Sequence, residues 1–242
     1  MIVSIHQPNF LPWLGFFHKM AAVDIFILLD NVPFTKNGYQ NRVKIKTAQG
    51  ERWLTVPVLT KGRFGQLTRD VPINPCVRWE HTHLATLRTN YRRAPFFGDV
   101  MRWLEPLYAH PPDRLAPFNR RLIEGVLDYV GLPVQMVSAS SLGVEGKGGE
   151  LLLKLVQAVG GTVYLSGPSG RHYLDPSLFH RAGVRLEFHQ FVHPRYPQLY
   201  GDFIPNLSIL DLLMNVGPVR AMDYLRGQAM APQPAFAVEV SV

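Results

Sequence analysis

IHQPNFLPWLGFFHKM (residues 5–20) joins two short apolar runs, and this arrangement predicts a strand, a helix and a second strand. The first run covers residues 1–5, and the second, residues 24–30, is rich in Ile and Leu. Each run is too short for a helix that is stable on its own. Two such runs about twenty residues apart, with a helix between them, form a βαβ unit, so a parallel sheet is expected.

The loop after the first predicted strand is crowded with polar side chains. It carries His6, Gln7 and Asn9, and Pro8 and Pro12 restrict its backbone. Open parallel sheets bind their ligands at the carboxyl ends of strands, which is the position of this loop. We therefore interpret the loop as a binding site, and a rigid turn without a functional role is the alternative interpretation.

A β-hairpin and a helical segment are expected in the middle of the chain. Residues 40–46 alternate polar and apolar side chains, and a turn separates them from residues 52–58, which predicts a hairpin. One more short strand is expected over residues 67–73. Apolar residues at three- and four-residue intervals then predict three successive helices within residues 77–130.

The last part of the chain alternates helices and strands, a pattern typical of a parallel sheet. Strands are expected over residues 134–137, 162–166 and 184–191, and helices over residues 146–159, 176–182 and 207–214. The predicted fold class is α/β: a mostly parallel sheet with flanking helices, a β-hairpin insertion near residues 38–58 and a helical segment over residues 77–130. We expect one domain over residues 1–242, with a frayed tail over residues 230–242.

The composition of the chain indicates the compartment in which the protein is expected. Cys76 is the one cysteine among 242 residues, so no disulfide can form within the chain, which fits a reducing cytoplasm. No apolar run approaches the roughly eighteen residues that a membrane span requires, and the first residues do not resemble a signal peptide. We therefore expect a cytoplasmic protein without a membrane span.

The chain is basic, with a formal net charge of +7 and a pI near 9.7. Basic charge favours an anionic partner. The arginines are scattered, and no Lys/Arg run, zinc-finger spacing or RNA-binding signature is present. We therefore expect an anionic small-molecule substrate or an acyl thioester carrier as the partner, and no nucleic acid polymer.

Three residues of the first βαβ unit are candidate catalytic groups. His6 titrates near neutral pH and could act as acid or base, or could be a structural histidine at a strand end. Lys19 could reach back to an anionic ligand or could lie in solvent. Asp30 ends the second strand, where ligand-contacting acids occur, although it could instead cap a turn.

The segment from Lys36 to Arg42 is a candidate substrate-binding segment, because it holds seven consecutive residues without an aliphatic side chain. Asn37 begins a tight turn. Tyr39 can stack on a planar group, Asn41 can form amide hydrogen bonds, and Arg42 can bind a phosphate or carboxylate through two donors. An exposed hairpin loop is the alternative interpretation.

Two later groups of polar residues are further candidates for substrate binding. The loop after the strand at residues 162–166 holds glycines whose amides could cradle an anion, without the spacing of a P-loop or of GxGxxG. Its candidates are Ser166, Gly167, Arg171 and Tyr173. A proline-stiffened group near the last helix supplies His193, Tyr196, Gln198, Asn206 and Asp211, of which the last can serve the helix start instead. The spacing of the histidines predicts no zinc site, and no cofactor is identified.

Several long motifs resemble the WbqC-like family. They are IHQPNFLPWLGFFHKM, DIFILLDNVPFTKNGYQNRVKIKT, WLTVPV, YRRAPFF, YLSGPSGRHYLD and FIPNLSILDLLMNVG, which together extend over nearly the whole chain. That family is bacterial and is found among genes for O-antigen and other surface polysaccharides, and in natural-product gene clusters. The resemblance implies a role in one of these biosynthetic pathways.

Three hypotheses for function follow from the motifs and the resemblance. The first is a transferase that modifies a nucleotide-linked or thioester-linked precursor in surface-polysaccharide or secondary-metabolite biosynthesis. The second is a nucleotidyl-transferring, adenylate-forming enzyme, because the His6 loop and the later Ser-Gly-x-x-x-Arg loop are loosely like enzymes with a HIGH-type motif. The third is a non-catalytic binding module in a biosynthetic complex, which would expose an apolar patch.

Overall fold

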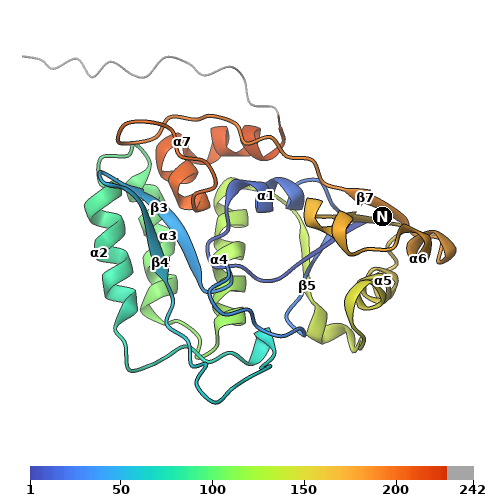
Figure 1. Cartoon of the computed structure of the whole chain (residues 1–242). Coiled ribbons are helices and arrows are strands. Elements are labelled where there is room, and N and C mark those ends of the chain that lie inside the picture. The colour runs from blue at the N-terminus through green and yellow to red at the C-terminus, as the bar shows by residue number, and fades with distance from the viewer. Residues whose placement is uncertain (228–242) are drawn as a thin grey trace, which may run out of the picture.

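The computed structural model describes residues 1–227 of the chain and contains a five-stranded parallel sheet (Figure 1). Its strands are β1 (Ile2–His6), β2 (Ile25–Leu28), β5 (Gln135–Ser138), β6 (Val163–Ser166) and β7 (Arg185–Phe188). Their order across the sheet is β5-β2-β1-β6-β7, and every neighbouring pair is parallel. The chain therefore leaves β1 in one direction toward β2 and later returns to its other side with β6, which makes the β1–β6 boundary a topological switch point.

Successive side chains of a strand point to opposite faces of the sheet, and those of the parallel strands belong to two hydrophobic clusters, one on each face. In β2, Phe26 and Leu28 belong to the larger cluster, whereas Ile25 and Ile27 belong to the smaller one. The larger cluster is completed by α1 (Leu14–Met20), α4 (Leu115–Val130) and α7 (Ile209–Leu225). The smaller cluster is completed by α5 (Gly148–Ala158) and α6 (Pro176–Arg181). Helices therefore cover both faces, and every residue of β2 is buried.

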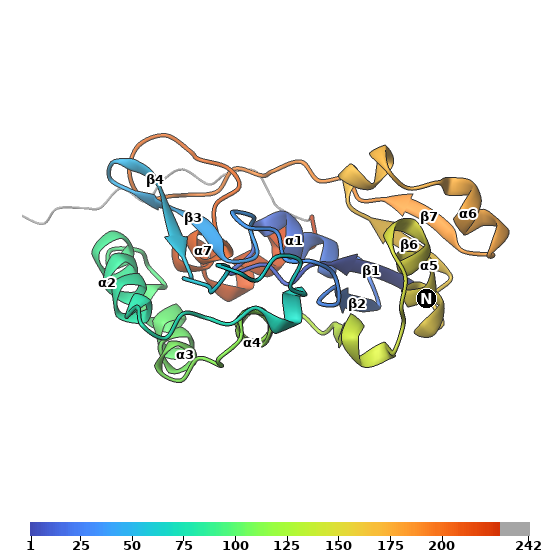
Figure 2. The same ribbon diagram turned by 60° about the horizontal axis from the view of Figure 1, so that its bottom comes forward.

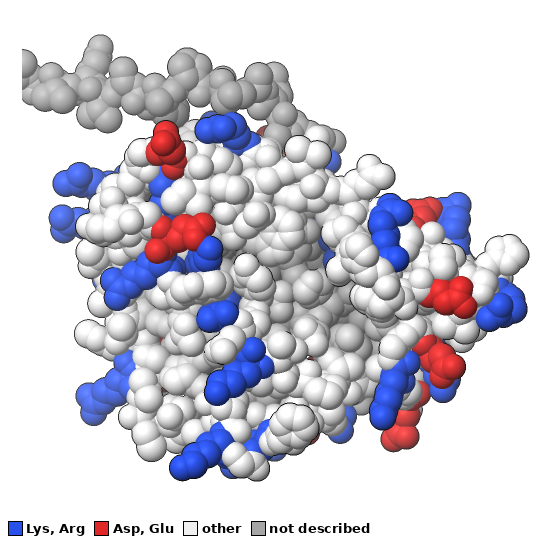
Figure 3. Space-filling view, in the orientation of Figure 1, with Lys and Arg blue, Asp and Glu red and all other residues white. Residues whose placement is uncertain are grey.

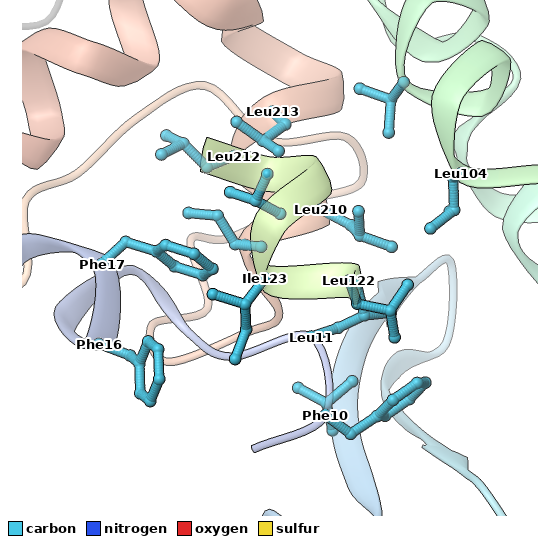
Figure 4. Packing of buried hydrophobic residues seen from close by; sticks show 14 of the residues in the cluster. Phe10, Leu11, Phe16, Phe17, Leu104, Leu122, Ile123, Leu210, Leu212 and Leu213 are labelled. Carbon is cyan, nitrogen blue, oxygen red and sulfur yellow. The ribbon is translucent and has the colours of Figure 1, made fainter. Parts of the chain in front are cut away.

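The β-hairpin forms a separate two-stranded sheet, with β3 (Arg42–Thr47) antiparallel to β4 (Gly50–Thr55). It lies at the end of the molecule that also holds α2 (Trp79–Tyr91) and α3 (Phe97–Ala109), away from β6 and β7 (Figure 2). The larger cluster joins this end of the molecule to the loop and helix that follow β1, since Phe10, Leu11, Phe16 and Phe17 meet Leu104, Leu122, Ile123, Leu210, Leu212 and Leu213 (Figure 4). Side chains of α3, α4 and α7 thus pack onto the loop and helix that follow β1.

Most of the predicted elements are confirmed. The α/β class, the parallel sheet, the hairpin insertion and three helices within residues 77–130 are all present. The predicted strand at residues 67–73 is wrong, because residues Thr68–Asp70 form a 3-10 helix, η1, flanked by isolated bridges at Leu67 and Ile73. Pro72 has no amide hydrogen for a ladder, and Val71 donates to the carbonyl of Thr68 instead.

Two boundaries near the end of the chain also differ from the prediction. The last strand ends at Phe188, before residues 189–191. The helix expected over residues 207–214 continues to Leu225, although Gly217 interrupts it with φ 74° and ψ 176°. The backbone of Gly217 lies against Phe96, since a β-carbon there would be 2.6 Å from that ring. The tail predicted over residues 230–242 lies outside the described residues.

The fold places the carboxyl ends of all five parallel strands along one edge of the sheet. Register aligns His6 with Leu28, and Leu28 with Ser138, across three strands. On the other side, Ser166 aligns with Phe188. The loops that leave these positions therefore lie next to one another. Among residues 1–227, no helix combines the length and hydrophobicity needed to cross a lipid bilayer.

Candidate functional site

A cavity of about 350 Å³ lies at the switch point between β1 and β6. Three segments supply most of its wall: the loop after β1, the helix α1 and the loop after β6. The predicted site residues among its lining are His6, Gln7, Lys19, Ser166, Gly167 and Tyr173. We call this space the first cavity. The position agrees with the general rule for ligand sites in open parallel sheets.

Lys19 is the most unusual group of the first cavity. It belongs to α1, whose apolar side chains are buried, and only 3% of the lysine is exposed. Its Nζ lies 3.4 Å from the carbonyl oxygen of Ile5 and 5.4 Å from the ring centroid of Phe26. Within the described chain, no carboxylate lies at ion-pair distance from it. Burial without a counter-charge lowers the pKa of Lys19 to about 7.

His6 occupies the carboxyl end of β1, beside Lys19. Its Nδ1 lies 3.0 Å from the carbonyl oxygen of Gln7, so Nδ1 carries the proton if it donates there. Its ring packs edge-on against Phe16, with centroids 5.0 Å apart. Burial, followed by the positive charge of Lys19, lowers the pKa of His6 to about 3. His6 is therefore a neutral imidazole over the whole physiological pH range, as a proton acceptor must be.

His189 also lines the first cavity and was missed as a site residue by the sequence argument. Its amide donates to the carbonyl of Ser166, which holds it beside the end of β6. Its Nε2 lies 2.8 Å from Nδ1 of His18, a half-buried residue of α1. Burial and the charges of His18 and Lys19 lower the pKa of His189 to about 4. The strand prediction hid the position of His189, because it extended the last strand to Phe191, whereas β7 ends directly before His189.

The loop after β6 is shaped by close packing around Ser166. This serine is buried, and its Oγ lies 3.2 Å from the carbonyl oxygen of Gly167. The loop continues as a short 3-10 helix, Pro168–His172. Gly170 is required there, because a β-carbon would lie 2.2 Å from the Oγ of Ser166. Arg171 does not line the cavity, since its guanidinium lies over the ring of Phe188 at 4.3 Å.

The hairpin residues lie outside the lining of the first cavity. Arg42 donates to the carbonyl of Asn37 and stacks over Trp53, with 4.4 Å from its Cζ to the ring centroid. Tyr39 is half exposed and packs against the same tryptophan. Asn41 is buried and donates to the carbonyl of Val56. Arg42, Tyr39 and Trp53 form a surface group of their own, and the binding role of the hairpin residues stays a prediction.

Asn9 and Asp30 also lie outside the lining of the first cavity. Asn9 is buried in the loop after β1. Asp30 accepts hydrogen bonds from the amide and the hydroxyl of Ser140 at 2.8 and 2.7 Å. It lines a second cavity, of about 370 Å³, at the ends of β2 and β5. A catalytic role for Asp30 stays a prediction.

The remaining candidates belong to the region that joins α7 to β3. Asp211 is fully buried and accepts hydrogen bonds from Tyr91, Tyr196 and Gln198, each at 2.8 Å. Burial raises the pKa of Asp211 to about 6, against the opposing effect of these donors. This network ties three segments together, and none of its members lines the first cavity.

His193 and Asn206 complete the predicted set. His193 stacks on Trp13, with ring centroids 6.4 Å apart, and Trp13 itself lines the first cavity. Asn206 is exposed and has φ 59°, a left-handed conformation that asparagine tolerates. Among residues 1–227, no three His, Cys, Asp or Glu side chains are grouped closely enough to hold a metal ion.

Comparisons with known proteins identify relatives of this chain. No solved structure gives a significant match. Uncharacterized protein Rv1507c of Mycobacterium tuberculosis is 39% identical over 226 residues, which cover 93% of this chain and 97% of that protein. The model of the WbqC-like protein family matches residues 7–223, a span that includes Lys19 and the loop after β6 but not His6. The resemblance of the motifs is thereby confirmed, and the chain belongs to the WbqC-like protein family.

Proposed function

We propose that this protein is an enzyme, a transferase that acts on an activated, anionic small molecule bound in the first cavity. The observation that carries the proposal is the unpaired lysine, Lys19, at a ligand-binding position of the sheet. A buried cation without a carboxylate is unfavourable in the empty protein, and an anionic ligand would supply the missing counter-charge. None of the described residues that line this cavity is Asp or Glu, so the lining offers no competing negative charge.

The proposed chemistry assigns separate roles to the cavity residues. His6 is neutral in the empty protein, and the negative charge of a donor bound beside it raises its pKa. His6 then accepts the proton that the acceptor loses as it attacks the donor, and the phosphate or thiolate of the donor leaves with the electrons of the broken bond. Lys19 faces the negative charge of the donor, and its protonated form is favoured once that charge is bound. The hydroxyl of Ser166 and the adjacent loop position the donor. Nucleotide-linked and thioester-linked precursors both fit, because each carries phosphate groups. Family membership supports a biosynthetic role in surface polysaccharides or secondary metabolites.

A second candidate function is nucleotidyl transfer. The observation that favours it is the meeting of the His6 loop and the Ser166–Arg171 loop at the switch point of a sheet ordered β5-β2-β1-β6-β7. Phe16 follows Gly15 where the second histidine of a HIGH-type motif would stand, which weakens the analogy. The third hypothesis, a non-catalytic binding module, requires an exposed apolar patch, and the burial of Phe16 and Phe17 weighs against it.

Calorimetric titration separates these candidates. The protein is titrated with a UDP-linked sugar, with coenzyme A, and with ATP plus magnesium. The transferase proposal expects micromolar binding of one of the first two, reduced at least about tenfold in Lys19→Met. The matched control is Lys154→Met, which changes an exposed lysine of α5.

Pyrophosphate release in the ATP titration would instead support nucleotidyl transfer. Equal binding by the Lys19→Met and Lys154→Met proteins would refute the assigned role of Lys19. No binding of any of the three probes would refute the proposed substrate class.

A further inference from the structure

The second cavity lies beside the first along the same edge of the sheet. Consecutive residues divide the two: Gln7 lines the first cavity and Pro8 the second, while Leu29 lines the first and Asp30 the second. The two volumes are similar, at about 350 and 370 Å³. The protein therefore has two neighbouring spaces of small-molecule size, separated by the loop after β1 and the residues after β2.

Cationic donors dominate the wall of the second cavity. Three arginines line it, Arg69 from η1, and Arg114 and Arg120 from the start of α4, together with the hydroxyl-bearing residues Ser138 and Ser140. The three arginines belong to a strongly basic part of the chain, because residues 31–130 hold sixteen Lys and Arg against eight Asp and Glu. The rest of the chain holds nine Lys and Arg against ten Asp and Glu, so all of the net positive charge comes from residues 31–130. Figure 3 shows this unequal distribution on one face, where Lys and Arg prevail over the end with α2, β3 and β4, and both charges mix over the end with α5 and α6.

The carboxylates of the second cavity balance the charges of these arginines but do not occupy all of their hydrogen-bond donors. Both oxygens of Asp30 accept from Ser140. Asp70 is shared, because Nη1 of Arg114 lies 3.0 Å from one of its oxygens and Nε of Arg69 lies 3.6 Å from the other. Two guanidinium groups with five donors each are thus served by one carboxylate, which leaves donors for a ligand.

A third arginine gives the second cavity a fixed donor group. Arg120 is held by Glu124 at 2.8 Å, by the Oγ of Ser138 at 3.1 Å and by the carbonyl oxygen of Met136 at 3.2 Å. These contacts fix the side chain against the end of β5. Glu124 neutralises Arg120, so the attraction for an anion comes mainly from Arg69 and Arg114.

We infer that the second cavity binds a second substrate, a small molecule that carries a phosphate group, with Arg69 and Arg114 as its anion-binding residues. The assignment of two substrates rests on the proposed function, because a transferase needs a donor and an acceptor. The binding site itself does not depend on that assignment. Asp70 competes with the bound anion for the same two arginines, which gives the inference a distinctive test.

The test is calorimetric titration of inorganic pyrophosphate into the Lys19→Met protein, in which the first cavity has lost its cation. Binding is expected to persist. Adding Arg114→Gln should weaken it roughly ten- to a hundredfold, the effect of losing a charge-assisted contact. Adding Asp70→Asn instead should tighten it roughly two- to fivefold, since the competing charge of an exposed ion pair is removed. The matched control is Arg185→Gln, which removes a guanidinium paired with Glu187 at 2.7 Å on β7.

The outcomes distinguish this inference from the proposed function. Complete loss of pyrophosphate binding in Lys19→Met would overturn the second site and leave the first cavity as the anion site. Undiminished binding in Lys19→Met, removed by Arg114→Gln, would support the second site and count against the role of Lys19. If Arg114→Gln behaves like Arg185→Gln, or if Asp70→Asn weakens binding, the second cavity is not an anion site.

Discussion

Replacing Lys19 with methionine is expected to stabilise the empty protein. Methionine fills nearly the same space, and the lysine that it replaces is 3% exposed without a counter-ion. Burial lowers the pKa of Lys19 from 10.5 to about 7, so the unfolded chain binds this proton more tightly than the folded protein. The protonated lysine therefore lowers the free energy of unfolding at any pH below about 10.

The size of this effect depends on pH in a defined direction. Below pH 7 the side chain is charged in both states, and the full shift corresponds to about 5 kcal/mol of lost stability, an upper bound. As pH rises above 7, the folded protein holds a neutral amine, and about 2 kcal/mol of the cost remains at pH 9. Losing the contact with the carbonyl of Ile5 offsets about 1 kcal/mol of the gain. The advantage of Lys19→Met should thus shrink by about 3 kcal/mol between pH 6 and pH 9.

Urea denaturation of the parent and Lys19→Met proteins at pH 6 and pH 9 measures the gain in the free energy of unfolding and its change with pH. Lys154→Met serves as the control, because that lysine is exposed and its substitution should leave the pH dependence unchanged. A Lys19→Met protein that is less stable than the parent at pH 6 would refute the reasoning. So would an equal advantage at both pH values, because the gain would then come from packing alone.

Three further predictions concern the core network, the pH dependence of binding and the loop after β6. Asp211→Ala should lower the free energy of unfolding by at least about 3 kcal/mol, because three buried donors lose their acceptor; an unchanged urea midpoint would contradict this. In the Arg114→Gln protein, whose second cavity has lost an anion-binding residue, pyrophosphate binding measured by calorimetry should weaken above pH 7 as Lys19 of the first cavity loses its proton near its pKa of about 7. A flat profile between pH 7 and pH 9 would exclude this lysine as the binding cation. Gly170→Ala should weaken the same binding, because its β-carbon would lie 2.2 Å from the Oγ of Ser166 and would displace that hydroxyl. The control is Gly98→Ala on α3, where a β-carbon meets no atom within 4 Å; equal effects of the two substitutions would show that the packing argument fails.

Local sequence patterns were sufficient to predict most of the sheet. The runs around Val3 and Ile27 are apolar except for Ser4, because these strands are covered on both faces, and short apolar runs separated by a helix have few alternative folds. The segment at residues 67–73 was predicted wrongly for a physical reason. Its apolar residues Val71 and Ile73 are buried, yet no neighbouring strand offers a continuous ladder, so burial alone did not make a strand.

The candidate site was predictable where it depends on strand ends. His6 and Ser166 were found because polar residues follow apolar strands, and Lys19 because it lies on the connecting helix. His189 was missed because the last strand was extended to Phe191, which hid its position at a carboxyl end. The sequence could not show whether the polar residues of the hairpin and of the Asp211 network line the candidate site. A buried polar network and a binding site use the same residue types. Only tertiary packing separates them.

The central position of β1 determines when the sheet can be completed during synthesis. β1 lies between β2 and β6, and the hydroxyl of Ser4 donates to the carbonyl of Leu165, 161 positions later in the chain. Ribosomes add roughly 5–20 residues per second, so one edge of β1 waits on the order of 10–30 s for its partner. Throughout this interval a strand of Val3 and Ile5 has an open edge in the nascent chain, a template for pairing with other chains. Rapid synthesis or chaperone protection of residues 1–30 should therefore favour the yield of folded protein over aggregate.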